Sequence, residues 1–405
     1  MGLGLKFNTS KSAAVVFSGS LETTLDSLRL GGSDVPILNS YKYLGITMSN
    51  DTDYLQGHHT HLRQAALRGA SILRKRSLWS CNRFIVSREL WKAVMVPGLT
   101  FANAVVCVPG DVRANMERRQ REVGRQALGC HGAVANEAVQ GDLGWSSFEA
   151  REASSKIAYD GRLRLMDRCR WAKRLFIYTN LTGLRTRWQK RLYQLQHKYG
   201  FFSDPVDAST ETEWTSEVRK RVRDSETQQW LQDAQTKSTL GVYLANKITI
   251  ASEVRLYDNS LGSRFLFEAR AGALRTLSYR RRFDTTVTST MCRVCGVNDE
   301  TVEHIVLDCA RLKPSRSQDN GPRRPRPLAL AEALGFTDSE IGKSTAVCPA
   351  TGLKVASNDT KRLVAETKKE TGGLVAEDPP QGALRHLRSQ AWAQTLFESS
   401  RFKGK

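Results

Sequence analysis

The chain has 405 residues, with 61 lysines and arginines against 41 aspartates and glutamates, which gives a net charge of +20 at pH 7. Its 40% hydrophobic and 25% charged residues are typical of a globular protein and exclude a membrane protein or a wholly disordered chain. Such an excess of positive charge favours a polyanionic partner, so we expect nucleic acid, with acidic proteins and anionic membrane surfaces as alternatives.

Residues 1–50 are expected to form a small β region. A polar turn followed by an apolar run over residues 7–17 predicts a short strand that ends at Ser18 and Gly19. Residues 35–38 and 41–46 predict two further strands, joined by Asn39 and Ser40.

Residues 51–285 are predicted to be almost wholly helical. Apolar residues recur at helical spacing along four stretches, which predicts amphipathic helices. These stripes are Leu62, Ala66, Gly69 and Leu73; Val112, Met116, Val123 and Ala127; Ala158, Leu165, Cys169, Ala172 and Phe176; and Leu184, Trp188, Leu192 and Leu195. A fifth helix is predicted to begin at a capping box that runs from Thr210 to Glu213.

The remaining helix faces carry mostly arginine and lysine, which favours contact with phosphates. Trp188, Tyr193 and Tyr199 lie among these cations, an arrangement that suits single strands because rings stack on bases. Core packing is the alternative for Trp188, since it also lies on an apolar stripe. The candidate nucleic-acid-binding residues are Arg118, Arg121, Arg125, Arg185, Arg187, Lys190, Arg191, Arg280, Arg281 and Arg282.

The clearest chemical signal is a pair of cysteines, Cys292 and Cys295, with two residues between them. His304 and Cys309 follow this pair. Three thiolates and one imidazole form a closed tetrahedral set for a structural zinc ion, with no position left for a substrate. The five steps from His304 to Cys309 rotate an ideal helix by about 140° beyond a full turn, so the helix that carries His304 must loosen there. The alternatives are a buried thiol pair beside an unrelated histidine, or a redox-active pair.

The zinc module is predicted to span 286–312, and a proline- and arginine-rich linker with a weakly ordered tail is predicted over 313–405. One short helix is expected over 328–334. Earlier in the chain, His58, His59 and His61 favour solvated or helix-capping roles over metal ligation.

No apolar run approaches the roughly 20 residues that cross a bilayer, and the first residues contain no secretory signal. The eight cysteines are thinly spread apart from the one cluster, which indicates a reducing compartment with a metal site. We therefore expect an intracellular protein, cytoplasmic or nuclear, with no membrane contact.

Four segments, 4–17, 41–46, 90–99 and 138–145, resemble successive parts of the reverse transcriptases of non-LTR (LINE-type) retrotransposons, including the arthropod copies called tick transposons. They resemble, in order, the strands after the catalytic aspartates, the primer-grip hairpin, the thumb and the helical connector. The Cys/His motif stands where that family has a C-terminal module usually assigned to RNA binding. The resemblance covers about 1–312 and implies a palm edge with a primer-grip-like hairpin over 1–50, a thumb-like helical domain over 51–145, a basic helical connector over 146–285 and a zinc knuckle over 286–312. This makes the expected fold mainly α.

That family holds two magnesium ions on an aromatic-x-Asp-Asp turn plus an upstream aspartate, and this sequence contains no Asp-Asp pair. We therefore expect a fragment that binds RNA or an RNA–DNA hybrid and is inactive alone as a polymerase. The alternatives are a free-standing zinc-module protein that binds or regulates RNA, a decayed copy without function, and a thumb half completed by a separately encoded palm.

Overall fold

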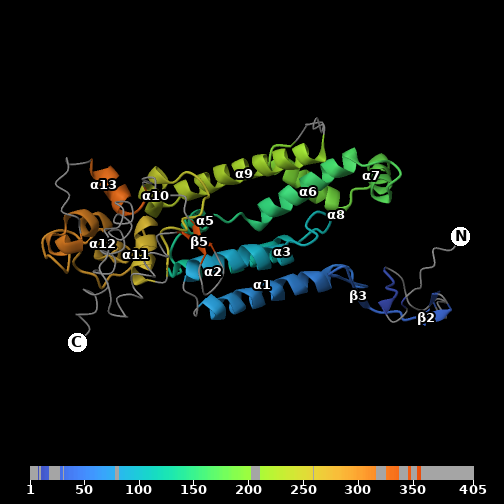
Figure 1. Ribbon diagram of the computed structural model, residues 1–405, viewed down its shortest axis with the longest axis horizontal. Helices are drawn as coiled ribbons and strands as arrows, with labels where there is room; N and C mark the ends of the chain where they lie inside the picture. The colour runs from blue at the N-terminus through green and yellow to red at the C-terminus, as the bar shows by residue number, and fades with distance from the viewer. Residues whose placement is uncertain are drawn as a thin grey trace.

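Helices make up most of the molecule and run along one long axis (Figure 1). The computed structural model describes residues 8, 11–17, 28–30, 32–77, 82–201, 210–258, 260–315, 325–336, 345–347 and 354–356. The linker over 316–324 and the tail from 357 onward lie outside these residues. None of the helices described is both long and apolar enough to cross a membrane.

The N-terminal β region consists of two antiparallel hairpins. Their strands are β1 (Leu28–Leu30), β2 (Ser33–Val35), β3 (Ser40–Tyr43) and β4 (Ile46–Ser49), paired β1 with β2 and β3 with β4. Leu44 and Gly45 have φ of +47° and +83°, which suits the tight turn between β3 and β4. The predicted strand over 41–46 is therefore wrong: it contains a strand and its turn. Residues 11–17 contribute one bridge, from Ala14 to Ile37.

A first group of helices packs around the predicted stripes. It comprises α1 (Gln56–Ser77), α2 (Arg83–Leu90), the π-helical η2 (Trp91–Met95), α3 (Val96–Leu99), α4 (Gly110–Leu128) and α5 (Asn136–Leu143). The first two predicted stripes are confirmed, because Leu62, Ala66, Leu73, Val112, Met116, Val123 and Ala127 are all buried. Trp91 is buried in the same core and donates its indole N–H to Gln120 Oε1 at 3.0 Å.

A second group forms the upper layer in Figure 1: α6 (Phe148–Leu165), α7 (Trp171–Leu181), α8 (Arg187–Lys198) and α9 (Glu211–Gln235). Its core includes Ile157, Leu195 and Trp214. Thr210 caps α9 by accepting from the Glu213 amide, which is one of the two hydrogen bonds of the predicted capping box.

The third predicted stripe is wrong, because the helix that it assumes is interrupted. α6 ends at the exposed Leu165, and α7 begins only at Trp171. Between them, Asp167 Oδ1 accepts a hydrogen bond from the Cys169 amide at 2.9 Å, a local side-chain bond that competes with helix formation. Cys169 is exposed and contributes nothing to the core.

The C-terminal elements pack back onto the first group and share its core. They are η3 (Ser238–Leu240), α10 (Gly241–Asn246), α11 (Leu261–Arg270), α12 (Leu277–Arg280), the π-helical η4 (His304–Asp308), η5 (Ala310–Ser315) and α13 (Arg326–Ala333), followed by a hairpin of β5 (Thr345–Val347) and β6 (Lys354–Ala356). The short helix expected over 328–334 corresponds to α13.

A buried charge cluster ties α5 to these C-terminal helices. Asp142, which is fully buried, accepts hydrogen bonds from the hydroxyl of Tyr243 at 2.6 Å and from Tyr257. Arg270 donates its Nε to Asp142 at 3.3 Å and its Nη1 to the Leu334 carbonyl at 2.8 Å. The segment 138–145 therefore has a structural role in joining the two parts of the fold.

Candidate metal centre and nucleic-acid interface

The four predicted ligands, Cys292, Cys295, His304 and Cys309, converge on one point, with all their ligand atoms within 4.8 Å of one another. Cys292 Sγ lies 4.0 Å from Cys309 Sγ, and Cys295 Sγ lies 3.3 Å from His304 Nε2. Two sulfurs bound tetrahedrally to one zinc lie about 3.8 Å apart, given Zn–S distances of about 2.3 Å. The cluster can therefore hold a metal ion, and its sulfur spacing is too long for a disulfide.

A tight backbone turn presents the first two ligands. Met291 bridges Asp299, and the Cys292 amide donates to the Asn298 carbonyl at 2.7 Å. The Gly296 amide donates to the Cys292 carbonyl at 2.8 Å, and Gly296 has a φ of +70°, which favours glycine. The turn therefore depends on this glycine to close around the thiols.

The turn that presents the other two ligands is widened. η4 is π-helical, and the Cys309 amide donates to the His304 carbonyl at 2.8 Å, five residues back. Thr301 Oγ1 accepts from the His304 amide at 3.0 Å and starts this turn. The prediction that the helix loosens between His304 and Cys309 is confirmed.

The surroundings of two thiols shift their pKa values in opposite directions. The backbone amides of Val297 and Asn298 donate to Cys295 and lower the pKa of its thiol to about 6. Burial raises the pKa of the Cys292 thiol to about 11. A divalent cation supplies the positive charge that a buried thiolate needs, and three thiolates with one imidazole are compatible with zinc.

The Cys/His cluster is part of the main fold. The main apolar core includes Cys292, Ile305, Val306, Cys309 and Leu312. The Glu300 carboxylate accepts from the Leu277 amide, at the start of α12, at 3.1 Å and from the Arg293 amide at 3.3 Å. Arg326 of α13 pairs with Glu303 at 3.0 Å and Asp308 at 2.8 Å. Residues 286–312 therefore depend on neighbours outside the module.

The predicted nucleic-acid-binding residues fall into exposed and internally bonded groups. The exposed ones are Arg118, Arg185, Arg187, Lys190, Arg281 and Arg282. Arg187 pairs with Asp53, and the half-exposed Arg280 pairs with Asp284, both at 2.9 Å. Surface pairs of this kind are weak, so Arg187 and Arg280 stay available to phosphates. Arg121 is half-buried in the wall of a cavity.

Arg125 and Arg191 are used inside the protein. Arg125 donates to the Val134 carbonyl at 3.0 Å and to Asn136 at 2.6 Å. Arg191 donates to Glu149 at 3.0 Å and to Glu152 at 2.8 Å. Because these bonds hold both side chains inside the protein, we remove both residues from the candidate interface.

The three aromatic candidates also differ. Trp188 donates its indole N–H to the Ala104 carbonyl at 2.7 Å and packs on the second core, which favours the core-packing alternative. Tyr199 is buried, so its predicted stacking role is wrong. Tyr193 is 65% exposed and fits the prediction.

An exposed basic edge follows α12, which the Glu300 carboxylate connects to the Cys/His cluster. Arg281 and Arg282 follow α12 directly, and Phe283, which is 74% exposed, comes next. The Glu300 carboxylate links the start of α12 to the backbone of the exposed Arg293. We call Arg281, Arg282, Phe283 and Arg293 the α12 edge.

The histidine pair at the start of α1 is buried, so the prediction of solvated or capping histidines is wrong for His58 and His59. They are 3% and 2% exposed and lie inside the first turns of the helix. His59 Nδ1 lies 3.3 Å from Asp53 Oδ2. Neither ring nitrogen of His58 has a hydrogen-bond partner among the residues described. His61 is exposed.

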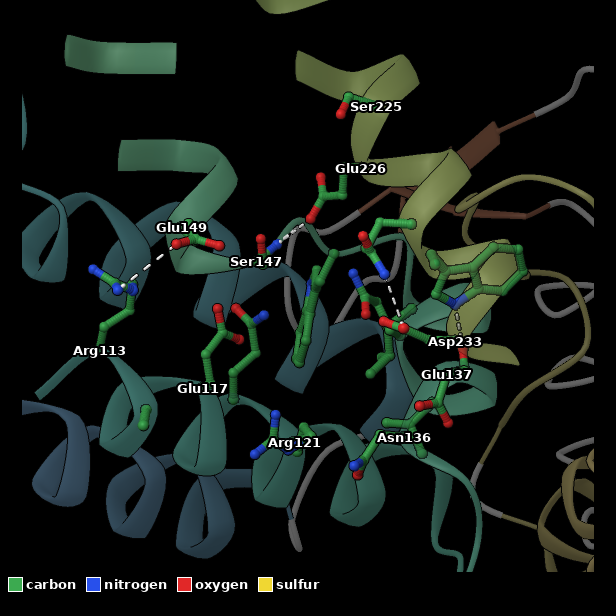
Figure 2. A pocket seen from close by; sticks show the side chains of 18 of the residues that line it. Arg113, Glu117, Arg121, Asn136, Glu137, Ser147, Glu149, Ser225, Glu226 and Asp233 are labelled. Atoms are coloured by element: carbon green, nitrogen blue, oxygen red, sulfur yellow. Dashed lines mark hydrogen bonds and ion pairs between the residues drawn. The ribbon is translucent and has the colours of Figure 1, made fainter. Parts of the chain in front are cut away.

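A polar cavity of about 460 Å³ lies between α4, α5, α6 and α9 (Figure 2). Glu226 accepts from the Ser147 amide at 2.6 Å, and Glu117 accepts from the Phe148 amide, so both cap the start of α6. Burial raises the pKa of both carboxyl groups. Figure 2 shows Arg113 paired with Glu149 at 3.7 Å on one side. Sequence spacing missed this cavity because its acids come from distant segments.

Comparisons of the chain with protein-family models, with curated proteins and with solved structures found no match.

Proposed function

We propose that this chain is a nucleic-acid-binding part of a non-LTR retrotransposon reverse transcriptase, and that it binds RNA or an RNA–DNA hybrid. The observation that carries the proposal is the α12 edge, a set of exposed cations and one exposed aromatic ring beside a Cys/His cluster. Cations attract phosphates, and an exposed ring stacks on an unpaired base. The net charge of +20 supports the same partner.

In this proposal the cluster of Cys292, Cys295, His304 and Cys309 binds one structural zinc ion. All four positions are filled by protein ligands, so the ion supplies no catalysis and instead fixes the turn that carries Arg293. The Glu300 carboxylate, which bonds to the amides of Arg293 and Leu277, connects this turn to α12. Zinc binding therefore holds the α12 edge in shape.

The salt dependence of RNA binding tests this function. The full chain is titrated onto a fluorescent single-stranded RNA at several salt concentrations, and the logarithm of affinity should fall by about 0.7 per phosphate contact for each unit of log salt. The double variant Arg281→Ala, Arg282→Ala should weaken binding to all sequences alike. It should also reduce the steepness of the salt dependence by the amount that about one to two phosphate contacts contribute.

Arg125→Lys is the matched control, because its side chain bonds inside the protein and the charge is retained. It should leave the salt slope unchanged. Affinity that is flat between low and physiological salt, or equal in the wild type and the double variant, would contradict the proposed interface.

A further inference from the structure

α7 leaves its apolar side in solvent. Trp171, Leu175, Tyr178 and Leu181 are 81%, 63%, 60% and 81% exposed, and α7 buries none of its residues. Their spacing of four, three and three residues places them on one face of the helix. An exposed face of this kind, rimmed by polar residues, marks an interaction site.

A groove of about 290 Å³ lies beside this face, between α6, α7 and α8. Its walls include the rings of Tyr159, Phe176 and Trp188, and its polar atoms come from Thr179, Thr186 and Gln189. Tyr159 meets Trp188 edge to face, with ring centroids 6.3 Å apart. Leu175 belongs both to the exposed face and to the groove, so the two surfaces are continuous.

The surrounding segment carries a large excess of positive charge. Residues 166–190 contain one carboxylate, Asp167, and the basic residues Arg168, Arg170, Lys173, Arg174, Arg185, Arg187 and Lys190. Within the described part of the chain, only Arg187 among them forms an ion pair. The Arg174 guanidinium lies 5.3 Å from the ring centroid of Trp171. An exposed ring and a cation are therefore paired on α7, within a strongly basic segment.

We infer that α7 and its groove bind a single-stranded stretch of nucleic acid, with one base on Trp171, another in the groove, and phosphates on Arg170, Arg174, Arg185 and Lys190. This inference rests on the proposed function and adds a second contact region to it. Stacking requires unpaired bases, so a duplex is the wrong ligand. A second copy of the chain is disfavoured, because this face would bring like charges together.

The test uses the full chain and fluorescence anisotropy with three labelled ligands of equal length: single-stranded RNA, the same RNA as a duplex, and an abasic ribose-phosphate strand. The double variant Trp171→Ala, Tyr178→Ala removes two exposed rings and keeps every charge. It should bind single-stranded RNA about 5- to 100-fold more weakly, since stacking on each base contributes on that scale. Its affinity for the abasic strand should change less than about twofold, because the phosphate contacts remain.

Ile248→Ala is the control, because Ile248 is 66% exposed and lies outside α7. It should bind like the wild type, and circular dichroism should show the same helix content for all three proteins. If the double variant keeps wild-type affinity for single-stranded RNA while Arg281→Ala with Arg282→Ala weakens it, the α7 site is wrong and the proposed function stands.

If the wild type binds no RNA at all, both proposals fail. A basic amphipathic helix also suits an anionic lipid surface, so phosphatidylserine vesicles provide one further arm. Vesicle binding that depends on Trp171 and Tyr178, together with RNA binding that does not, would overturn the α7 inference in favour of a membrane contact.

Discussion

His58 is an ionisable side chain buried without a hydrogen-bond partner in the described structure. Burial, together with the positive charges of His59, His61 and Lys42, lowers its pKa from 6.5 to about 4. The folded protein therefore holds His58 neutral, whereas the unfolded chain takes up a proton below pH 6.5. Protonation of His58 in the unfolded chain therefore favours unfolding at acidic pH. The stability of the folded protein has no such loss above pH 6.5 and decreases as the pH falls towards 4.

We predict that the free energy of unfolding falls by up to about 3 kcal/mol between pH 7 and pH 4 through His58 alone. His58→Leu should remove this part of the pH dependence. The measurement is urea denaturation at a series of pH values. His61→Gln is the control, because His61 is exposed, and this variant should keep most of the pH dependence. A His58→Leu protein with the pH dependence of the wild type would refute the prediction.

The Cys/His cluster could be predicted from sequence because all four residues lie in one short segment, and their spacing encodes a local geometry. The internal roles of Arg125 and Arg191 could not, because the partners of Arg191, Glu149 and Glu152, come from a different helix. Sequence shows that a residue is basic, and only the fold shows whether its charge is already used.

At the scale of elements, the Asp142 cluster joins α5, α11 and α13. Asp142 is fully buried and Arg270 is 1% exposed, so removing the Asp142 charge leaves the buried Arg270, among the described residues, with only a 3.9 Å ion pair to Glu253. We predict that Asp142→Asn lowers the free energy of unfolding by about 3–5 kcal/mol, measured by urea denaturation.

The double variant Asp142→Leu, Arg270→Met removes both charges and should be less destabilised than the sum of its single variants. Asp224→Asn is the control at an exposed position of α9 and should unfold like the wild type. Strict additivity of the two single substitutions would show that these charges do not stabilise each other.

The helices were predictable where their apolar stripes continue without a break, as in α1 and α4. The break between α6 and α7 was not, because the side-chain bond of Asp167 to the Cys169 amide ends the helix within an otherwise helical pattern. The exposed face of α7 was missed for a related reason. Its apolar residues have the spacing of a core helix, and the sequence does not show that nothing covers them.

At the scale of the molecule, α7 and α12 lie towards opposite ends of the long axis (Figure 1). α9 alone has 25 residues between the two ends, which is about 37 Å of helix. We predict that RNA affinity rises steeply once an oligonucleotide is long enough to reach both regions, because the second contact becomes intramolecular.

A length series from about 6 to 40 nucleotides checks this prediction. The wild type should show the rise, and Trp171→Ala with Tyr178→Ala should remove it while short-strand binding at the α12 edge persists. A single plateau from the shortest strands onward would mean that only one region binds.

The whole chain should not extend a primer when it is supplied with magnesium and deoxynucleotides. Two-metal phosphoryl transfer needs paired carboxylates to anchor both cations, and the sequence has no Asp-Asp pair. Primer extension above that of a heat-inactivated sample, and abolished by a chelator, would contradict this expectation.

The most direct measurement is RNA affinity of the metal-stripped full chain during titration with zinc. Because the ion is proposed to hold the α12 edge, stripped protein should bind RNA about as weakly as Arg281→Ala with Arg282→Ala. Affinity should then recover and saturate at one zinc per chain, and His304→Ala should fail to recover. An RNA affinity that does not change with added zinc, or a chain that binds no zinc, would contradict the account.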